Sequence, residues 1–262
     1  MKPAPFAYHR PSSREEVDGL LAELGGEAKL LAGGQSLVPI LNMRLAAPAH
    51  VIDINFLRDE PADPVLDDGA LVFGPLVRMR AAERSPLVGE HLPLLAEVLQ
   101  HVAHPAIRSR GTVTGSIAHA DPAAELPALL VLLEGEARVR SADGRRTVAA
   151  DELFAGHLET TLRSGEWIEE VRMPARAGGA FEEFARRHGD YALCGVGALA
   201  VGDAFALSFV GMSAVPERLV VGDVREAVAR LEPEDDLHAT ADYRRRLAET
   251  LGERAARRAL EA

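Results

Sequence analysis

The stretch that decides the fold reads Leu31-Ala32-Gly33-Gly34-Gln35-Ser36-Leu37, and a second glycine-bearing stretch, Gly111-Thr112-Val113-Thr114-Gly115-Ser116, follows about eighty positions later. Small residues let backbone N–H groups approach an anion closely, and serine and threonine hydroxyls add further donors. Residues 29–32 read as a short apolar strand that runs into the first stretch. The pair of stretches indicates a ligand that carries phosphate.

Composition limits the class of protein. The chain has 262 residues, of which 47% are hydrophobic and 26% charged, and its formal net charge is −11. This length favours two packed units over one core. The negative charge, without any run rich in Lys or Arg, argues against nucleic acid. We expect a small molecule or another protein as partner.

The chain contains one cysteine, Cys194, which we expect to be a small buried hydrophobic residue. One cysteine excludes an internal disulfide and an iron–sulfur cluster held by this chain alone. No apolar run has the length of a membrane span, and no signal-peptide pattern opens the chain. The sequence therefore predicts a cytoplasmic protein without a membrane span.

Periodicity predicts a mixture of helices and antiparallel strands, which is the α+β class. Ser12 and Glu15 form a capping-box pattern before a helix that ends at Gly25. Turn signals at Asp143-Gly144 and Gly202-Asp203 each predict a hairpin. Further strands are predicted at 51–54, 71–73 and 167–173, and helices at 92–102, 125–133, 224–231 and 243–260.

A domain boundary is predicted at residues 175–180, where small residues follow Pro174. In the last helix Tyr243, Leu247 and Leu251 lie on one stripe, which predicts a docked amphipathic helix.

Three well-known motifs are absent. The first glycine stretch lacks the G-x-G-x-x-G spacing of dinucleotide-binding sheets, and Pro39 follows it too closely for a long helix. No Gly-Lys-Ser/Thr follows, which excludes a P-loop. The spacing of His119, Asp121 and Glu125 matches no metal-ligand motif, so no metal site is predicted.

Several stretches together resemble one known family. They are residues 31–39, 43–45, 53–54, 107–127, 186–192 and 243–247. Nearly the whole chain is similar to the FAD-binding medium subunits of molybdenum hydroxylases, the group typified by carbon monoxide dehydrogenase and xanthine dehydrogenase. The resemblance implies a two-part FAD-binding fold of the vanillyl-alcohol-oxidase type, over residues 1–56 and 57–175, followed by a small α+β domain over 176–262.

The resemblance also implies non-covalent FAD between the parts of the chain. Residues 30–37 would wrap the pyrophosphate, and residues 112–116 would approach the diphosphate, ribityl chain or ring edge. The expected cofactor-binding residues are Leu30, Leu31, Ala32, Gly33, Gly34, Gln35, Ser36, Leu37, Val102, Ile107, Gly111, Thr112, Val113, Thr114, Gly115, Ser116, Asp121, Glu125, Ile168, Asp190 and Tyr191.

Some of these positions have a second interpretation. Asp121 either caps the following helix or contacts the flavin. Tyr191 either packs in the core or lies beside the flavin. Thr114 stands where the family commonly has glycine, and its Cβ and hydroxyl either change the backbone approach or add a bond. Ala185 stands where some relatives carry Lys, so no cationic contact is inferred there.

By this resemblance the chain is an electron-transfer subunit of an oxidoreductase. FAD would take electrons from [2Fe–2S] clusters of a small subunit and release them to an external acceptor, while a molybdopterin-binding large subunit oxidises the substrate. A dimer of heterotrimers is expected. Two alternatives remain open: a self-sufficient FAD-dependent oxidase of the same fold, and a degenerate scaffold without flavin. The sequence identifies neither the substrate nor the acceptor.

Overall fold

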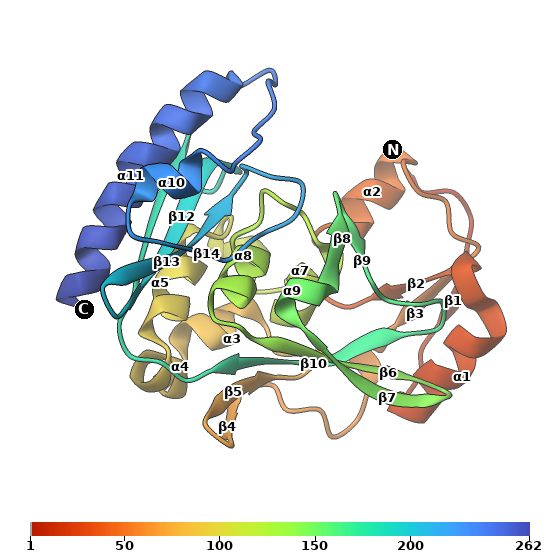
Figure 1. Cartoon of the computed structure of the whole chain (residues 1–262). Coiled ribbons are helices and arrows are strands. Elements are labelled where there is room, and N and C mark those ends of the chain that lie inside the picture. The colour runs from red at the N-terminus through yellow and green to blue at the C-terminus, as the bar shows by residue number, and fades with distance from the viewer. Residues whose placement is uncertain (1) are drawn as a thin grey trace.

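The computed structural model describes residues 2–262, so Met1 of the predicted first subdomain lies outside the described residues. The N-terminal part forms a small parallel sheet flanked by helices (Figure 1). Its strands, in spatial order, are β1 (Ala7–His9), β3 (His50–Asp53) and β2 (Ala28–Leu31). Its helical elements are α1 (Arg14–Leu24), η1 (Gly25–Glu27), α2 (Leu37–Met43) and η2 (Ile54–Phe56). Since β2 and β3 are parallel, both end at the edge where residues 32–36 begin.

The cap of α1 differs from the predicted one by one residue. Ser13 has extended backbone angles, and its hydroxyl accepts from the N–H of Glu16 at 3.2 Å. The Glu16 carboxylate in turn accepts from the N–H of Ser12 at 2.6 Å. The predicted pair of Ser12 and Glu15 is therefore wrong, because the first residue with helical geometry is Arg14. The stop at Gly25, with φ of 54°, is confirmed.

Residues 65–174 contribute an antiparallel sheet and most of the helices. The strand order is β4 (Val65–Asp67), β5 (Ala70–Phe73), β10 (Trp167–Pro174), β6 (Glu136–Ser141) and β7 (Gly144–Ala149). The remaining elements are α3 (Met79–Arg84), α4 (Pro86–His91), α5 (Pro93–His101), α6 (Pro105–Arg108), α7 (Val113–His119), α8 (Glu125–Leu132), α9 (Ala150–Leu153), β8 (Phe154–Gly156) and β9 (Glu159–Thr160). Every residue of α8 is buried, as expected for a helix that is apolar on all sides.

The C-terminal part is an antiparallel sheet with one long helix across it (Figure 1). The strands follow in chain order as β11 (Ala180–Ala185), β12 (Ala192–Val201), β13 (Ala204–Val210) and β14 (Leu219–Val221), and the helices are α10 (Val224–Val228) and α11 (Ala241–Glu261). Cys194 and Val196 face α11, whereas Leu199 belongs to the cluster that includes α8. A Cβ on Gly197 would lie 2.7 Å from Cδ2 of Leu132, so glycine here lets α8 pack closely against β12.

The sequence predictions agree with most of this architecture. The α+β class, both hairpins and the buried state of Cys194 are confirmed. The predicted docking of the last helix is confirmed, since Leu251 is buried and Leu247 packs against the core, but Tyr243 is wrong: it is 37% exposed, whereas Arg244 is only 6% exposed. Ala248 and Leu251 continue the buried face from Arg244, which donates to the Leu193 carbonyl. The domain limits at residues 56 and 175 stay a prediction.

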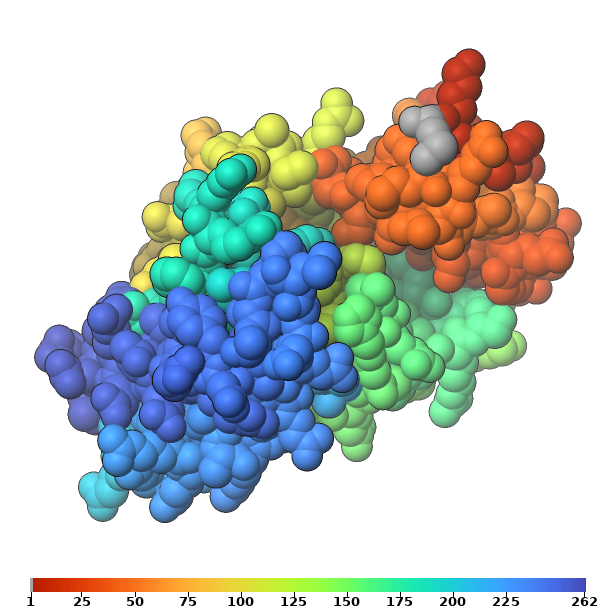
Figure 2. All heavy atoms as spheres, turned by 90° about the horizontal axis from the view of Figure 1, so that it is seen from above, coloured from red at the N-terminus to blue at the C-terminus, as the bar shows by residue number. Residues whose placement is uncertain are grey.

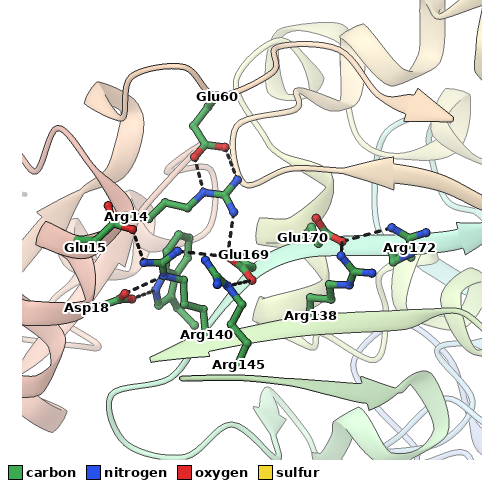
Figure 3. Close-up of polar contacts among 11 residues, drawn as sticks. Arg14, Glu15, Asp18, Glu60, Arg138, Arg140, Arg145, Glu169, Glu170 and Arg172 are labelled. Atoms are coloured by element: carbon green, nitrogen blue, oxygen red, sulfur yellow. Dashed lines mark hydrogen bonds and ion pairs between the residues drawn. The ribbon is translucent and has the colours of Figure 1, made fainter. Parts of the chain in front are cut away.

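A cluster of charges joins α1 to the five-stranded sheet (Figure 3). The Arg14 guanidinium donates to Glu169 of β10 at 2.8 Å and to Glu60 at 2.6 Å. The Arg140 guanidinium of β6 donates to Asp18 of α1 at 2.7 Å. Because these side chains are largely buried and each is paired, removal of one partner leaves an uncompensated charge. The cluster therefore holds the N-terminal sheet in one orientation on the second sheet.

A membrane-spanning helix is not found within residues 2–262, because no helix there combines the required length with an apolar surface.

Candidate functional site

A cavity of about 730 Å³ lies where the three parts of the chain meet. Figure 2 shows it as a hollow between the N-terminal residues, in red and orange, and the teal segment that joins β11 to β12. Of the residues expected to bind the cofactor, all except Leu31 and Val113 line this cavity. Positions far apart in the sequence are therefore brought to one site.

The first glycine stretch forms one wall and touches the second directly. A Cβ on Gly33 would lie 2.4 Å from the Arg110 carbonyl oxygen and 2.6 Å from Cα of Gly111. Gly34 adopts a φ of 71°, which glycine tolerates at low cost. The two stretches therefore pack backbone against backbone, and a side chain at position 33 has no room.

The amides of this first wall are free. Within residues 2–262, no group accepts a hydrogen bond from the backbone N–H of residues 33–36. The loop leads directly into α2, and the Ser36 hydroxyl makes no cap bond to that helix. Unpaired amides at the start of a helix form a site for an anion, since the helix dipole adds to their partial positive charge. We name residues 33–36 the open-amide loop.

Two side chains that were not predicted as site residues hold the open-amide loop in place through hydrogen bonds. The Asn55 amide donates to the Ala32 carbonyl at 2.8 Å. Its oxygen accepts from Arg78 at 2.5 Å, and the same guanidinium donates to the Arg110 carbonyl at 2.6 Å. Asn55 and Arg78 therefore link the two walls. No sequence signal identifies them, because their partners lie more than twenty positions away.

The second glycine stretch is the start of helix α7, not an open loop. Thr112 is its N-cap, and the Thr112 hydroxyl accepts from the N–H of Gly115 at 3.0 Å. Three further N–H groups of residues 111–116 donate to backbone carbonyls. In the described part of the chain, only the amides of Thr112 and Thr114 in this stretch lack an acceptor. Most amides of this stretch are therefore engaged within the protein, and its predicted approach to the cofactor stays a prediction. We name residues 111–116 the capped helix start.

The two expected residues outside the cavity have structural positions. Val113 is fully buried, and its N–H donates to the Val77 carbonyl at 3.1 Å. Leu31 packs behind Gly34, where a Cβ would lie 3.0 Å from its Cδ1. Neither side chain reaches the cavity.

Thr114 adds a hydrogen bond within the protein. Its side chain is 3% exposed and lines the cavity. The hydroxyl donates to the Gly74 carbonyl at 2.9 Å, so it fixes α7 to the turn that follows β5. The hydroxyl is therefore engaged within the protein.

Part of the cavity lining is acidic. Glu125, the first residue of α8, is 6% exposed, and burial raises its pKa to about 8, helped by the nearby charges of Glu183 and Asp121. Asp121 does not cap α8, whose N-cap is Ala124; its carboxylate instead accepts from the N–H of Ala123 at 2.9 Å. The cap interpretation of Asp121 is therefore wrong.

Tyr191 lies at the mouth of the cavity with an exposed fraction of 66%, so its interpretation as a core residue is also wrong. Asp190 and Gly189 of the same loop line the cavity beside it, and Gly189 packs against the ring of His104.

This arrangement fits a dinucleotide. The free amides and the free hydroxyl of the open-amide loop suit phosphate oxygens, and Gly33 lets this loop pack directly on the second stretch. Apolar side chains such as Val102, Ile107 and Ile168 line the rest of the cavity, which suits flat rings. Within residues 2–262, no group of three or more His, Cys, Asp or Glu is arranged to hold a metal ion. The fold and site define a protein that binds a flavin dinucleotide.

Comparisons with known proteins agree. Residues 4–176 match the family described as FAD binding domain in molybdopterin dehydrogenase. The 6-hydroxypseudooxynicotine dehydrogenase complex subunit alpha of Paenarthrobacter nicotinovorans is 35% identical, over 99% of this chain and 96% of that protein. The nicotine 6-hydroxylase medium subunit of the same organism is 40% identical, over 90% of this chain and 81% of that protein.

Among solved structures, carbon monoxide dehydrogenase from Hydrogenophaga pseudoflava, in a form lacking the Mo-pyranopterin moiety, matches with a TM-score of 0.92 and 35% identity. The match covers 100% of this chain and 99% of that one. The chain belongs to the family of FAD-binding medium subunits of molybdenum hydroxylases.

Proposed function

We propose that this medium subunit transfers electrons. It takes them from [2Fe–2S] clusters of a small partner subunit and passes them to an external acceptor, while a molybdopterin-binding large subunit oxidises the substrate. The observation that carries the proposal is the cavity of about 730 Å³, which is lined by both the open-amide loop and the buried Glu125. The single cysteine, buried in the C-terminal sheet, leaves the clusters to a partner chain.

Each wall has a role in this proposal. The open-amide loop binds the pyrophosphate through N–H groups, and charge-assisted bonds of this kind contribute about 1.5–3 kcal/mol each. The capped helix start forms the adjoining wall and offers the amides of Thr112 and Thr114 with the Ser116 hydroxyl. Val102, Ile107 and Ile168 exclude water from the rings. Bound FAD supplies exchange between one- and two-electron chemistry.

The remaining expected residues act near the ring system. Glu125 provides an acid at the closed end of the cavity, and Asp190 and Tyr191 cover its mouth. Tyr191 is well placed to cover one side of the flavin, because its ring is exposed and not packed in the core.

The test is to purify the chain with the products of adjacent coding sequences and to measure flavin, iron and molybdenum. We expect one FAD for each copy of this chain, with iron and molybdenum only in the partner chains. A chain that oxidises substrate alone would overturn the proposal, and so would a folded preparation without flavin absorbance from flavin-replete cells. Acid precipitation separates the oxidase alternative, because covalent flavin would stay in the pellet.

The assembly as a dimer of heterotrimers and the cytoplasmic location stay predictions. Light scattering of the purified complex tests the first, and fractionation of cells tests the second.

A further inference from the structure

A buried carboxylate that no cofactor contact explains lies behind the cavity. Glu183 of β11 has a side chain that is 5% exposed, and its Oε1 lies 3.7 Å from Nδ1 of His101 at the end of α5. Its Oε2 is buried and has no hydrogen-bond partner among residues 2–262. Buried polar atoms in native proteins nearly always have a partner, which is ordered water where no protein group serves. A water held between Glu183 and a further polar group would satisfy this oxygen.

Glu125 is the further polar group to which such a water would bind. Helix α8, which begins at Glu125, packs on β12 and β13, and the N–H of Gly211 donates to the Pro122 carbonyl just before that helix at 2.9 Å. Glu183 is paired with Gly195 in the same sheet. The charge of Glu183 reaches Glu125 strongly enough to raise the pKa of Glu125.

The nearest cation does not neutralise the two acids. Arg108 donates to Glu83 at 2.9 Å and to the carbonyls of Val102 and Ala103 at 2.8 and 2.9 Å. Its donors are thus largely engaged by these partners. Burial therefore favours the protonated form of the Glu125 carboxyl group.

His101 supplies the solvent end of this cluster. Its side chain is 34% exposed, and its ring packs against Phe181 with centroids 5.2 Å apart. The neighbouring Glu183 carboxylate raises the pKa of His101, so this imidazole holds its proton more readily near neutral pH than usual. His101 therefore lies on the solvent side of Glu183, while Glu125 lines the cavity.

We propose that His101, Glu183 and Glu125 form a path for protons between solvent and the flavin cavity. The inference rests on the proposed function, in which electrons arrive from iron–sulfur clusters of the partner. When two electrons enter the bound flavin, the O–H bond of Glu125 breaks and a ring nitrogen gains the proton. Glu183, through the water, returns a proton to Glu125 from His101, and solvent reprotonates His101. When the external acceptor removes the electrons, the proton travels outward.

Other charged groups face this path without belonging to it. His101 is also faced by Glu97 and Glu182, which both bind Arg258, at 2.7 and 2.9 Å. Glu125 is also faced by Asp121 and Arg108. Glu182 therefore provides a matched control, because it lies next to Glu183 on the same strand and outside the path.

The main experiment compares Glu183→Gln with Glu182→Gln in the intact complex with its partner subunits. FAD content is measured first, and flavin reduction by substrate is then followed by stopped-flow absorbance across pH. We expect full FAD content in both variants and reduction slowed by about 100-fold in Glu183→Gln alone, the lower end of what a positioned proton donor contributes. Wild-type rates and pH dependence in Glu183→Gln would overturn the path and leave the proposed function intact. A wild-type complex without FAD would overturn the proposed function instead.

A second variant keeps the test valid if Glu183→Gln does not fold. His101→Ala should slow reduction similarly, and added imidazole should restore the rate, because the vacated site is open to solvent. Slowing that imidazole does not restore indicates a purely structural role and overturns the path. NMR titration of the free chain gives a readout that does not depend on activity. The pKa of His101 should fall in Glu183→Gln. An unchanged pKa would show that the two side chains are not paired, and this result would also contradict the path.

Discussion

The open-amide loop and the capped helix start have similar composition but opposite hydrogen-bonding states. Residues 33–36 leave their N–H groups free, whereas most N–H groups of residues 111–116 are bonded within the protein. Thr112 contributes to the difference, because its hydroxyl accepts from the N–H of Gly115 in the first turn of α7, whereas Ser36 makes no cap bond to α2. Small residues and hydroxyls therefore indicate close backbone approach, but they do not say whether the amides are available to a ligand.

We infer that the first stretch binds FAD and that the second stabilises the fold. If this is right, changes in the open-amide loop reduce FAD content, and changes in the capped helix start reduce the free energy of unfolding.

The largest effect is expected from Gly33→Ala. The new Cβ would meet backbone atoms of residues 110 and 111 at 2.4 and 2.6 Å, and neither can rotate away. The two walls must separate, at a cost of about 3 kcal/mol or more, so FAD content should fall below roughly a tenth of wild type. The ratio of flavin to protein absorbance measures it. Gly26→Ala is the control, because a Cβ there meets nothing within 4 Å, and an equal loss in both variants would contradict the direct contact.

The second effect concerns Glu125, whose buried carboxyl group lines the cavity. Burial raises the pKa of Glu125 from 4.5 to about 8, so the folded apoprotein retains a proton that the unfolded chain releases between these values. The contribution of this group to stability is therefore fully present below about pH 4.5 and is lost as the pH rises to about 8, by a few kcal/mol. Glu125→Gln should remove this loss.

Urea unfolding of the apoprotein at acidic and alkaline pH measures the loss. Glu253→Gln on the exposed side of α11 is the control, and it should keep the wild-type pH dependence. An unchanged pH dependence in Glu125→Gln would contradict the raised pKa.

A smaller effect is expected at the cap of α7. Thr112→Ala removes the acceptor of the Gly115 N–H and should lower the free energy of unfolding by about 1–2 kcal/mol. FAD content should remain near wild type at saturating FAD, since the freed amide adds a donor and removes none. Thermal unfolding with and without FAD measures both effects, and Thr112→Ser should restore stability. A loss of FAD without a loss of stability would reverse the assignment of the two regions.

The smallest effect is expected from Thr114→Val. This change removes the hydroxyl bond to Gly74 and keeps the side-chain volume, so stability should fall by about 1 kcal/mol. Thr114→Ser keeps the donor and serves as control. FAD affinity, from titration of the apoprotein, should stay within about twofold of wild type, because the hydroxyl already donates within the protein. A larger loss of affinity would show that this hydroxyl serves the ligand.

Local patterns predicted most of the secondary structure correctly, because the turns and helices concerned depend on neighbouring residues. Asp143-Gly144 closes the β6–β7 hairpin, and Gly25 ends α1. The errors arose where one position decides a face or a cap. Ser13 replaces Ser12 as the N-cap of α1, and Arg244 replaces Tyr243 on the buried face of α11, because its guanidinium finds carbonyl acceptors that lie over thirty positions away in the chain.

The sequence by itself determined the family, the α+β class and the two glycine stretches, since these depend on residue identity and short spacing. Only the tertiary structure decided that the stretches touch at Gly33, that Asn55 and Arg78 join them, and that most amides of the second stretch are bonded within the protein. It also placed Glu125, Glu183 and His101 together from three separate elements. The physical reason is that a hydrogen bond or a buried charge depends on which distant segment the fold brings within a few ångströms, and local sequence does not encode that neighbour.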